Sequence, residues 1–178
     1  QYTEEELLEF FEQQTTGWLS WITSNDKYAR EKLSGDIETL ESWYLDRGYL
    51  EFQIASTQVS ISPEKESVYI TINIDEGDVF TIDEVELAGE LMIPEAQIRA
   101  MIILKKGMTF SQTLMTTSSE YITRRLGNEG YTFAEVEGFP EINEEEGTAK
   151  ITYLVKPGMR AYVRRVEFRG NTKTADFV

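Results

Sequence analysis

The chain has 178 residues, a formal net charge of −15 and a sequence isoelectric point near 4.4. Nucleic acids and anionic membrane surfaces both attract lysine and arginine, so this charge argues against either as a ligand. A hydrophobic fraction of 40% and an aromatic fraction of 12% are typical of folded domains, and the length suffices for one ordinary domain or two small ones. A protein or peptide remains as the expected partner.

The chain contains neither cysteine nor histidine. Disulfides, thiol nucleophiles and cysteine-ligated zinc are therefore excluded, and the commonest general base and transition-metal ligand is missing. No stretch approaches the roughly 20 apolar residues of a membrane-spanning helix, and no signal peptide opens the chain. We expect a soluble segment, mature or excised from a longer chain, that is not an enzyme and binds no cofactor or metal.

The beginning of the chain predicts two helices. Thr3 and Glu6 form a capping box, in which the hydroxyl and the carboxylate satisfy backbone N–H groups at a helix start. A second helix that ends at Gly48 is indicated by an apolar stripe at helical spacing. The residues of this stripe are Leu33, Ile37, Leu40 and Tyr44.

Two strands follow, and the first of them is irregular. Phe52 and Ile54 share one phase of the alternation, whereas Val59 and Ile61 have the opposite phase. A β-bulge at residues 55–57 would restore one inward face, and because bulges favour sheet edges we place this strand at an edge. The second strand alternates cleanly with a period of two, which is typical of a half-buried strand. Its apolar residues are Val68, Ile70, Ile72 and Ile74.

The second half of the chain repeats this order. Residues 81–89 predict a strand, and Pro94 is typical of the first position of the helix that follows. A second helix ends at Gly130, two strands come after it as in the first copy, and residues 162–170 predict one more strand. The helical stripe consists of Met115, Ser119, Ile122 and Leu126, and the second of the two strands carries Ala149, Ile151, Tyr153 and Val155.

The two halves are copies of one unit. Residues 43–49 match residues 125–131 at an offset of 82, and residues 85–89 match residues 166–170 at an offset of 81. We place the one-residue difference at residues 62–67, a polar turn where length changes are tolerated. The unit therefore reads strand, helix, helix, strand, strand. The predicted modules are residues 1–79, which lack the opening strand, residues 80–159, which are complete, and residues 160–178, the first strand and helix start of a third.

A tandem β-α-α-β-β unit of about 80 residues, with Gly-Tyr at the turn from helix to strand, resembles the POTRA (polypeptide-transport-associated) domain. Four strings are similar to the periplasmic arm of the Omp85 family of outer-membrane assembly proteins, in the order of its third module, its fourth and the start of its fifth. They are LDRGY at 45–49, STQVS at 56–60, PEIN at 140–143 and YVR at 162–164. The resemblance implies an α+β fold, in which a three-stranded mixed sheet packs on two helices with its second strand at an edge. It also implies a periplasmic location, with membrane contact only through a barrel that is absent from this sequence.

An unpaired sheet edge offers backbone N–H and C=O groups to which an extended peptide can add as a strand. We predict that residues 51–60 form such a docking edge, with apolar contacts from Val59 and Ile61 at its far end. The resemblance implies unfolded outer-membrane protein precursors and accessory lipoproteins of the assembly complex as partners. The alternative is that the apolar residues belong to the core and the edge is silent. The candidate residues are Glu51, Gln53, Ala55, Thr57, Val59, Ser60 and Ile61.

Two further groups of residues are candidate interfaces. Trp18 and Trp21 lie in an aromatic segment without a counterpart in the second copy, and they either contact a partner or cap the core of their own module. Capping is the favoured interpretation. A basic stretch near the end of the chain either orients modules, or meets an acidic partner, or is a solvated strand, which is the commoner case. Its residues are Lys156, Arg160, Arg164, Arg165, Arg169 and Lys173.

The acidic clusters at residues 75–78 and 143–147 are interpreted as turns, because neither has the ligand spacing of a calcium loop. Two functions remain: a chaperone-like docking arm for outer-membrane protein assembly, or a structural spacer that sets the geometry of a larger complex. A carboxylate-based hydrolase is a distant third. Because the first module lacks a strand that residues 161–170 could supply from a neighbouring chain, strand-swapped self-association is also expected.

Overall fold

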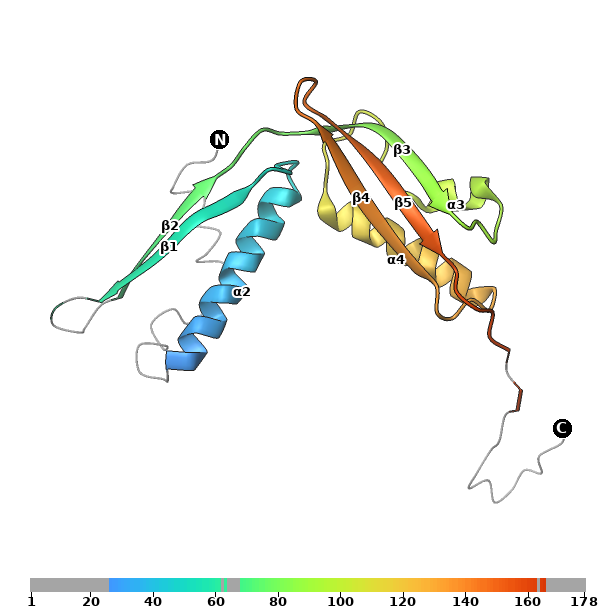
Figure 1. Ribbon diagram of the computed structural model, residues 1–178, viewed down its shortest axis with the longest axis horizontal. Coiled ribbons are helices and arrows are strands. Elements are labelled where there is room, and N and C mark those ends of the chain that lie inside the picture. Colours follow the sequence, from blue (N-terminus) through green and yellow to red (C-terminus); the bar gives the residue numbers. More distant parts are fainter. Residues whose placement is uncertain (1–25, 62, 64–67, 163, 166–178) are drawn as a thin grey trace, which may run out of the picture.

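The computed structural model describes residues 26–61, 63, 68–162, 164 and 165. Its helices and strands form two groups, and each group places helix against sheet (Figure 1). The first group consists of α2 (Asp26–Leu45), β1 (Gln53–Ile61) and β2 (Val68–Asp75). The second consists of β3 (Thr81–Gly89), α3 (Glu95–Met101), α4 (Gln112–Asn128), β4 (Glu135–Asn143) and β5 (Thr148–Lys156).

In the first module, α2 packs on the hairpin of β1 and β2 through an aromatic cluster. Tyr44 is completely buried and stacks on Phe52, with ring centroids 4.1 Å apart. Leu40 and Tyr49 complete the buried cluster. The tyrosine hydroxyl donates a hydrogen bond to the Glu76 carboxylate at 2.8 Å. The predicted helical stripe is therefore confirmed, and its C-terminal half forms the contact with the sheet.

The β-bulge predicted in the first strand is present. The antiparallel register of β1 and β2 shifts between Ile54 and Ser56, so that Ala55 is the extra residue. The expected inward face does not extend along the whole strand, because Val59 is 56% exposed. The buried aromatic cluster gathers at the Phe52 end of β1, and the other end of the strand extends past it.

The bulge also corrects the predicted place of the length difference between the two copies. Ile61 pairs with Val68, and Ile142 pairs with Ala149, so both sides of the hairpin tip repeat at an offset of 81. The tips are therefore equal in length, and residues 62–67 do not carry the difference. Because β4 pairs with β5 without a bulge, the extra residue of the first copy is Ala55.

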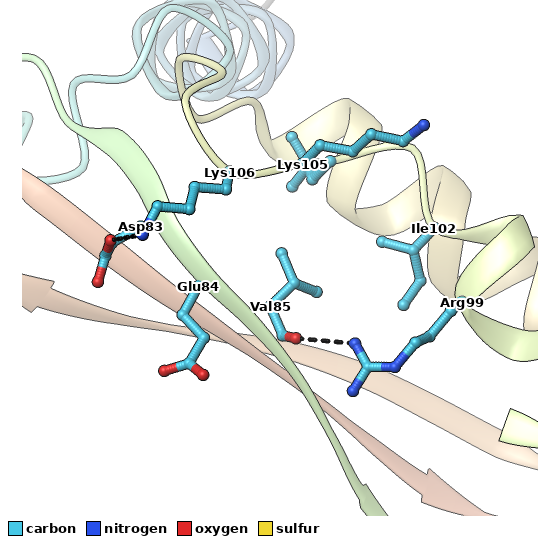
Figure 2. A pocket seen from close by; sticks show the side chains of 8 residues that line it. Asp83, Glu84, Val85, Arg99, Ile102, Lys105 and Lys106 are labelled. Carbon is cyan, nitrogen blue, oxygen red and sulfur yellow. Dashed lines mark hydrogen bonds and ion pairs between the residues drawn. The ribbon is translucent and has the colours of Figure 1, made fainter. Parts of the chain in front are cut away.

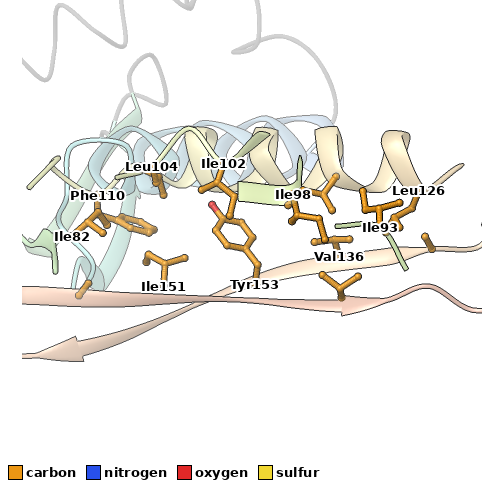
Figure 3. Close-up of a cluster of buried hydrophobic side chains, with 14 of the residues drawn as sticks. Ile82, Ile93, Ile98, Ile102, Leu104, Phe110, Leu126, Val136, Ile151 and Tyr153 are labelled. Atoms are coloured by element: carbon orange, nitrogen blue, oxygen red, sulfur yellow. The ribbon is translucent and has the colours of Figure 1, made fainter. Parts of the chain in front are cut away.

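The second module contains a three-stranded mixed sheet in the order β3-β5-β4. The central strand β5 pairs parallel with β3 and antiparallel with β4, and both helices cover one face of this sheet (Figure 1). Figure 3 shows Ile151 and Tyr153 pointing from the sheet to the helices, where Ile98 and Leu126 meet them in the core. The four apolar residues predicted on β5 are all buried, which confirms the alternation read from the sequence.

Two predicted boundaries need correction. Pro94 precedes α3 rather than opening it, because its ψ of 132° is extended and Glu95 is the first helical residue. Tyr162, Arg164 and Arg165 belong to no strand. A strand needs a neighbouring strand to pair with, and the strand pairings of the described part of the chain do not include these three residues. The remainder of that predicted strand, and the capping box near the start of the chain, lie outside the described residues.

The two modules are joined through the turn that follows α2. The carboxylate of Asp46 accepts hydrogen bonds from the backbone N–H and the hydroxyl of Thr113, each at 2.7 Å, and from the hydroxyl of Ser111 at 3.1 Å. Ser111 is itself the N-cap of α4 and accepts from the N–H of Leu114. The first turn of a helix leaves backbone N–H groups without partners and carries partial positive charge. A residue of the first module therefore helps to cap a helix of the second.

Gly48 allows the same turn to approach the second module closely. Its φ of +93° suits glycine, and a Cβ at this position would lie 2.6 Å from Cγ2 of Thr109. The carbonyl of Gly48 accepts a hydrogen bond from the N–H of Phe80 at 2.9 Å, and Leu50 packs against the core of the second module. The turn is thus inserted between the modules and touches both.

The cap predicts the effect of removing the Asp46 side chain. The substitution Asp46→Ala should cost about 0.5 to 2 kcal/mol at this junction, the usual range for loss of an N-terminal cap. That cost corresponds to roughly 2- to 30-fold faster hydrogen exchange of the Thr113 amide, measured by NMR. The control is Asp36→Ala, which removes a carboxylate of α2 outside the junction. Unchanged Thr113 exchange in Asp46→Ala would show that the cap contributes nothing.

The same carboxylate predicts a pH dependence. Burial by itself raises the pKa of Asp46, but the hydrogen bonds from Thr113 and Ser111, together with the charge of Arg47, outweigh it and lower that pKa below its ordinary value. A lowered pKa in the folded state means stabilisation that is present above the ordinary pKa and is lost as pH falls through the folded value. The Thr113 amide shift should therefore titrate with a midpoint below about 3.9, the ordinary aspartate pKa. A midpoint at or above that value would contradict the expected stabilisation.

Candidate functional site: the outer edge of the first sheet

The candidate docking edge lies on β1, the strand that follows the junction turn. In the part of the chain that the structure describes, β1 pairs only with β2, and its other edge has no neighbouring strand. Most of the predicted docking residues are exposed: Gln53, Ala55, Thr57, Val59 and Ser60. Glu51 is half-buried just before the strand, and the side chain of Ile61 lies outside the described part.

The chemical character of this edge is neutral and partly apolar. The strand carries no charged side chain between Gln53 and Ile61. Val59 is 56% exposed, and Tyr69, in the neighbouring strand, is 62% exposed. Phe52, by contrast, is buried in the aromatic cluster, so at this position the core interpretation is the correct one. An edge of this kind can pair with an added strand through its backbone without selecting for charge.

The other predicted interface residues are only partly described. Trp18, Trp21, Arg169 and Lys173 lie outside the described residues. Arg164 and Arg165 are exposed, whereas Lys156 forms an ion pair with Glu137 at 3.5 Å. Arg160 donates to the carbonyl of Glu129 at 2.9 Å and lies near the rings of Tyr131 and Tyr162. Lys156 thus contacts its own module, whereas Arg160 connects the segment after residue 159 to the turn that follows α4.

The sequence interpretation missed exposed apolar residues on the second module. Phe139 is 46% exposed and Ile142 is 41% exposed, both on β4, which among the described strands pairs only with β5. Phe133, just before that strand, is 73% exposed. The repeat itself carried the signal, because β4 is the counterpart of β1 in the second copy. β4 is therefore a second candidate edge strand, in addition to β1.

An open pocket of about 500 Å³ lies beside β3 (Figure 2). Three of its charged side chains are paired, because Lys106 bonds Asp83 at 2.7 Å and Arg99 donates to the carbonyl of Val85 at 3.2 Å and to Glu95 at 2.7 Å. The hydrogen bond with Asp83 and its charge raise the pKa of Lys106, which keeps the ammonium protonated. Glu84 and Lys105 also line the pocket, so its lining carries two carboxylates and three basic side chains.

No group of three or more carboxylate, histidine or cysteine side chains in the described ranges is arranged to hold a metal ion. Within the same ranges, no helix has both the length and the apolar character that crossing a membrane requires.

Comparison with known proteins gives two curated relatives of high coverage. The outer membrane protein assembly factor BamA of Neisseria meningitidis serogroup B is 27% identical over 178 residues, which cover 99% of this chain and 22% of that protein. BamA of Buchnera aphidicola is 27% identical over 179 residues, which cover 99% of this chain and 29% of that protein. The chain thus spans less than a third of the length of either relative.

Solved structures agree with the fold. The crystal structure of Haemophilus influenzae BamA POTRA3-5 matches with a TM-score of 0.69 and 30% identity over 80% of this chain and 57% of that one. Haemophilus ducreyi BamA lacking POTRA domains 1-3 matches with a TM-score of 0.59 over 71% of this chain and 23% of that one, and its 19% identity shows the fold alone.

The family comparison bears directly on the repeat. The POTRA model, described as a surface antigen variable number repeat, matches residues 1–77 and again residues 80–158. Together with the BamA relatives, this confirms the predicted resemblance to the POTRA arm of the Omp85 proteins and the α+β class of the fold. The chain belongs to the POTRA family.

Proposed function

We propose that this chain is a periplasmic docking and chaperone-like arm of the machinery that assembles outer-membrane proteins, and that it binds extended polypeptides by strand addition to β1. The observation that carries the proposal is the outer edge of β1, which has no strand beside it in the described part of the chain. The printed names of the relatives, outer membrane protein assembly factor, support the biological context.

The chemistry of the edge suits clients of many sequences. Backbone N–H and C=O groups supply most of the affinity in strand addition, and these groups are the same for every residue type except proline. The neutral side chains of β1 add no charge selection, and Val59 offers an apolar contact. The proposed clients are unfolded outer-membrane protein precursors, and the proposed second class of partner is an accessory lipoprotein of the assembly complex. We do not assign an enzymatic activity to the chain.

The alternative function is a structural spacer that fixes the geometry of a larger complex. The junction favours it, because Asp46 and Gly48 connect the two modules through side-chain and backbone hydrogen bonds. A rigid junction is useful to a docking arm as well, since it fixes the direction in which β1 presents its edge. Peptide binding is therefore the measurement that distinguishes the two functions.

The docking function predicts a localised response to peptide. An NMR titration of the isotope-labelled chain with a capped ten-residue peptide from an outer-membrane barrel strand should shift backbone amides of residues 51–60 and of their neighbours in β2. The expected cause is new main-chain hydrogen bonding at β1. The control is the same peptide with every backbone amide N-methylated, which has no N–H to donate on either edge and should leave the amides unmoved. No shift at millimolar peptide would favour the spacer function.

A missing strand predicts self-association of the chain. In the described residues the sheet of the first module has two strands, whereas the sheet of the second has three. We expect a neighbouring chain to lend a strand from residues 161–170, which should raise the mass measured by light scattering as concentration increases. A control chain ending at Gly158 has no such strand to lend and should remain monomeric. A full chain that is strictly monomeric at high concentration would refute the exchange.

A further inference from the structure

The two edge strands of the repeat differ at one backbone position. β4, like β1, pairs on one side only in the described part of the chain. The sequence of β4 contains Pro140, whereas β1 contains no proline. Proline has no N–H to donate, and its ring occupies the space where that N–H would point. The question is therefore which side of β4 the proline nitrogen faces.

The register answers this question. β4 pairs with β5 without interruption from Glu135 to Asn143, and Pro140 lies opposite Ile151. In an antiparallel ladder a residue either exchanges both hydrogen bonds with its opposite or turns both groups outward. A proline facing β5 would lack the N–H that its own pair needs and would break the ladder at Pro140, yet the pairing with Ile151 lies inside an unbroken register. The nitrogen of Pro140 therefore faces outward, in the middle of the free edge.

The position is equivalent to one in the proposed docking strand. Val59 lies opposite Ile70, and Pro140 lies opposite Ile151, which follows Ile70 at the 81-residue offset of the repeat. After the bulge at Ala55 the two registers coincide, so that Val59 and Pro140 occupy the same place in their sheets. The first module carries a residue with an N–H there, and the second module carries a residue without one.

We propose that Pro140 closes the edge of β4 to strand addition and so confines docking to β1, an inference that deepens the proposed function of β1. An added strand on β4 would lose a donor at its centre and meet the proline ring instead of a hydrogen. Proline on an exposed edge is a recognised means of preventing such pairing. Pro140 is exposed in the structure, so no core contact explains its presence.

The surroundings of Pro140 show why this edge needs closing. Phe139 and Ile142 are 46% and 41% exposed, and apolar side chains on an unpaired edge favour pairing with other chains. The strand also carries Glu135, Glu137 and Glu141, all exposed, whereas β1 has no charge along its length. Charge disfavours some peptides, but only the missing donor acts on every peptide whatever its sequence.

The test is the substitution Pro140→Val, which gives β4 the residue that β1 has at the same place. The peptide of the titration above is added to the labelled wild type and to the variant, and both are checked by circular dichroism for unchanged folding. In the wild type, amides of β4 should not move. In the variant they should, with at least about fivefold tighter binding at β4, because one regained backbone hydrogen bond contributes about 1 kcal/mol. The backbone amide that the substitution introduces should become protected from hydrogen exchange when peptide is present.

The matched control is Glu141→Val, which introduces the same side chain next door and removes a charge but keeps Pro140. The β4 amides of Glu141→Val should not shift when the peptide is added. Three outcomes would overturn the inference. They are peptide binding at wild-type β4 as strong as at β1, no shift of the β4 amides in Pro140→Val, and equal peptide binding at β4 in Glu141→Val. If the β1 amides of the wild type do not shift with peptide, the proposed function is contradicted but the role of Pro140 is not. Peptide binding at β4 in Pro140→Val would still support that role.

Discussion

The arrangement of the two modules depends on a backbone hydrogen bond, from the N–H of Phe80 to the carbonyl of Gly48 at 2.9 Å. This bond connects the chain that leaves the first module to the turn at the end of α2. The repeat uses it again, because Ala161 donates to the carbonyl of Gly130 at 2.8 Å. The two glycines have φ of +93° and +95°, a conformation that few other residues adopt. In each module, the segment that leaves the module is thus bonded to the turn that follows the module's long helix, before the next module begins.

Side chains of and beside the same turn also contact the following module. The Asp46 carboxylate caps α4, and Leu50 reaches the core of the second module. These contacts use groups at the end of one helix and the start of another, where backbone hydrogen bonds are in any case incomplete. These junction bonds use no residue of β1 or β4, so the two outer sheet edges are free to differ from one another.

Periodicity predicted much of the fold. The stripe that ends at Tyr44 and the alternation that ends at Val155 locate a helix and a strand, because each pattern follows from a local geometry that repeats along the chain. Even the bulge at Ala55 was visible as a change of phase. The exposure of Val59 could not be predicted from the sequence, since it depends on how far the aromatic cluster reaches along the hairpin. The bond between Asp46 and Thr113 joins residues 67 positions apart, and no local pattern signals it.

The same distinction holds for the candidate site. An edge strand was expected at residues 50–62 from irregular phase alone, and the structure has β1 unpaired on one side within its described part. The meaning of Pro140 required the register, because a proline may face either side of a strand and only the pairing with Ile151 decides which. The side of the strand that a backbone nitrogen faces, unlike the alternation of apolar side chains, cannot be read from the sequence of that strand alone.

The capping of α4 by Asp46 also bears on the order in which the chain acquires its structure during synthesis. Domains form from the N-terminus as the ribosome releases them. The turn that carries Asp46 and the hairpin behind it are complete in sequence before Ser111 and Thr113 emerge. The first turn of α4 therefore forms against an acceptor that is already in place.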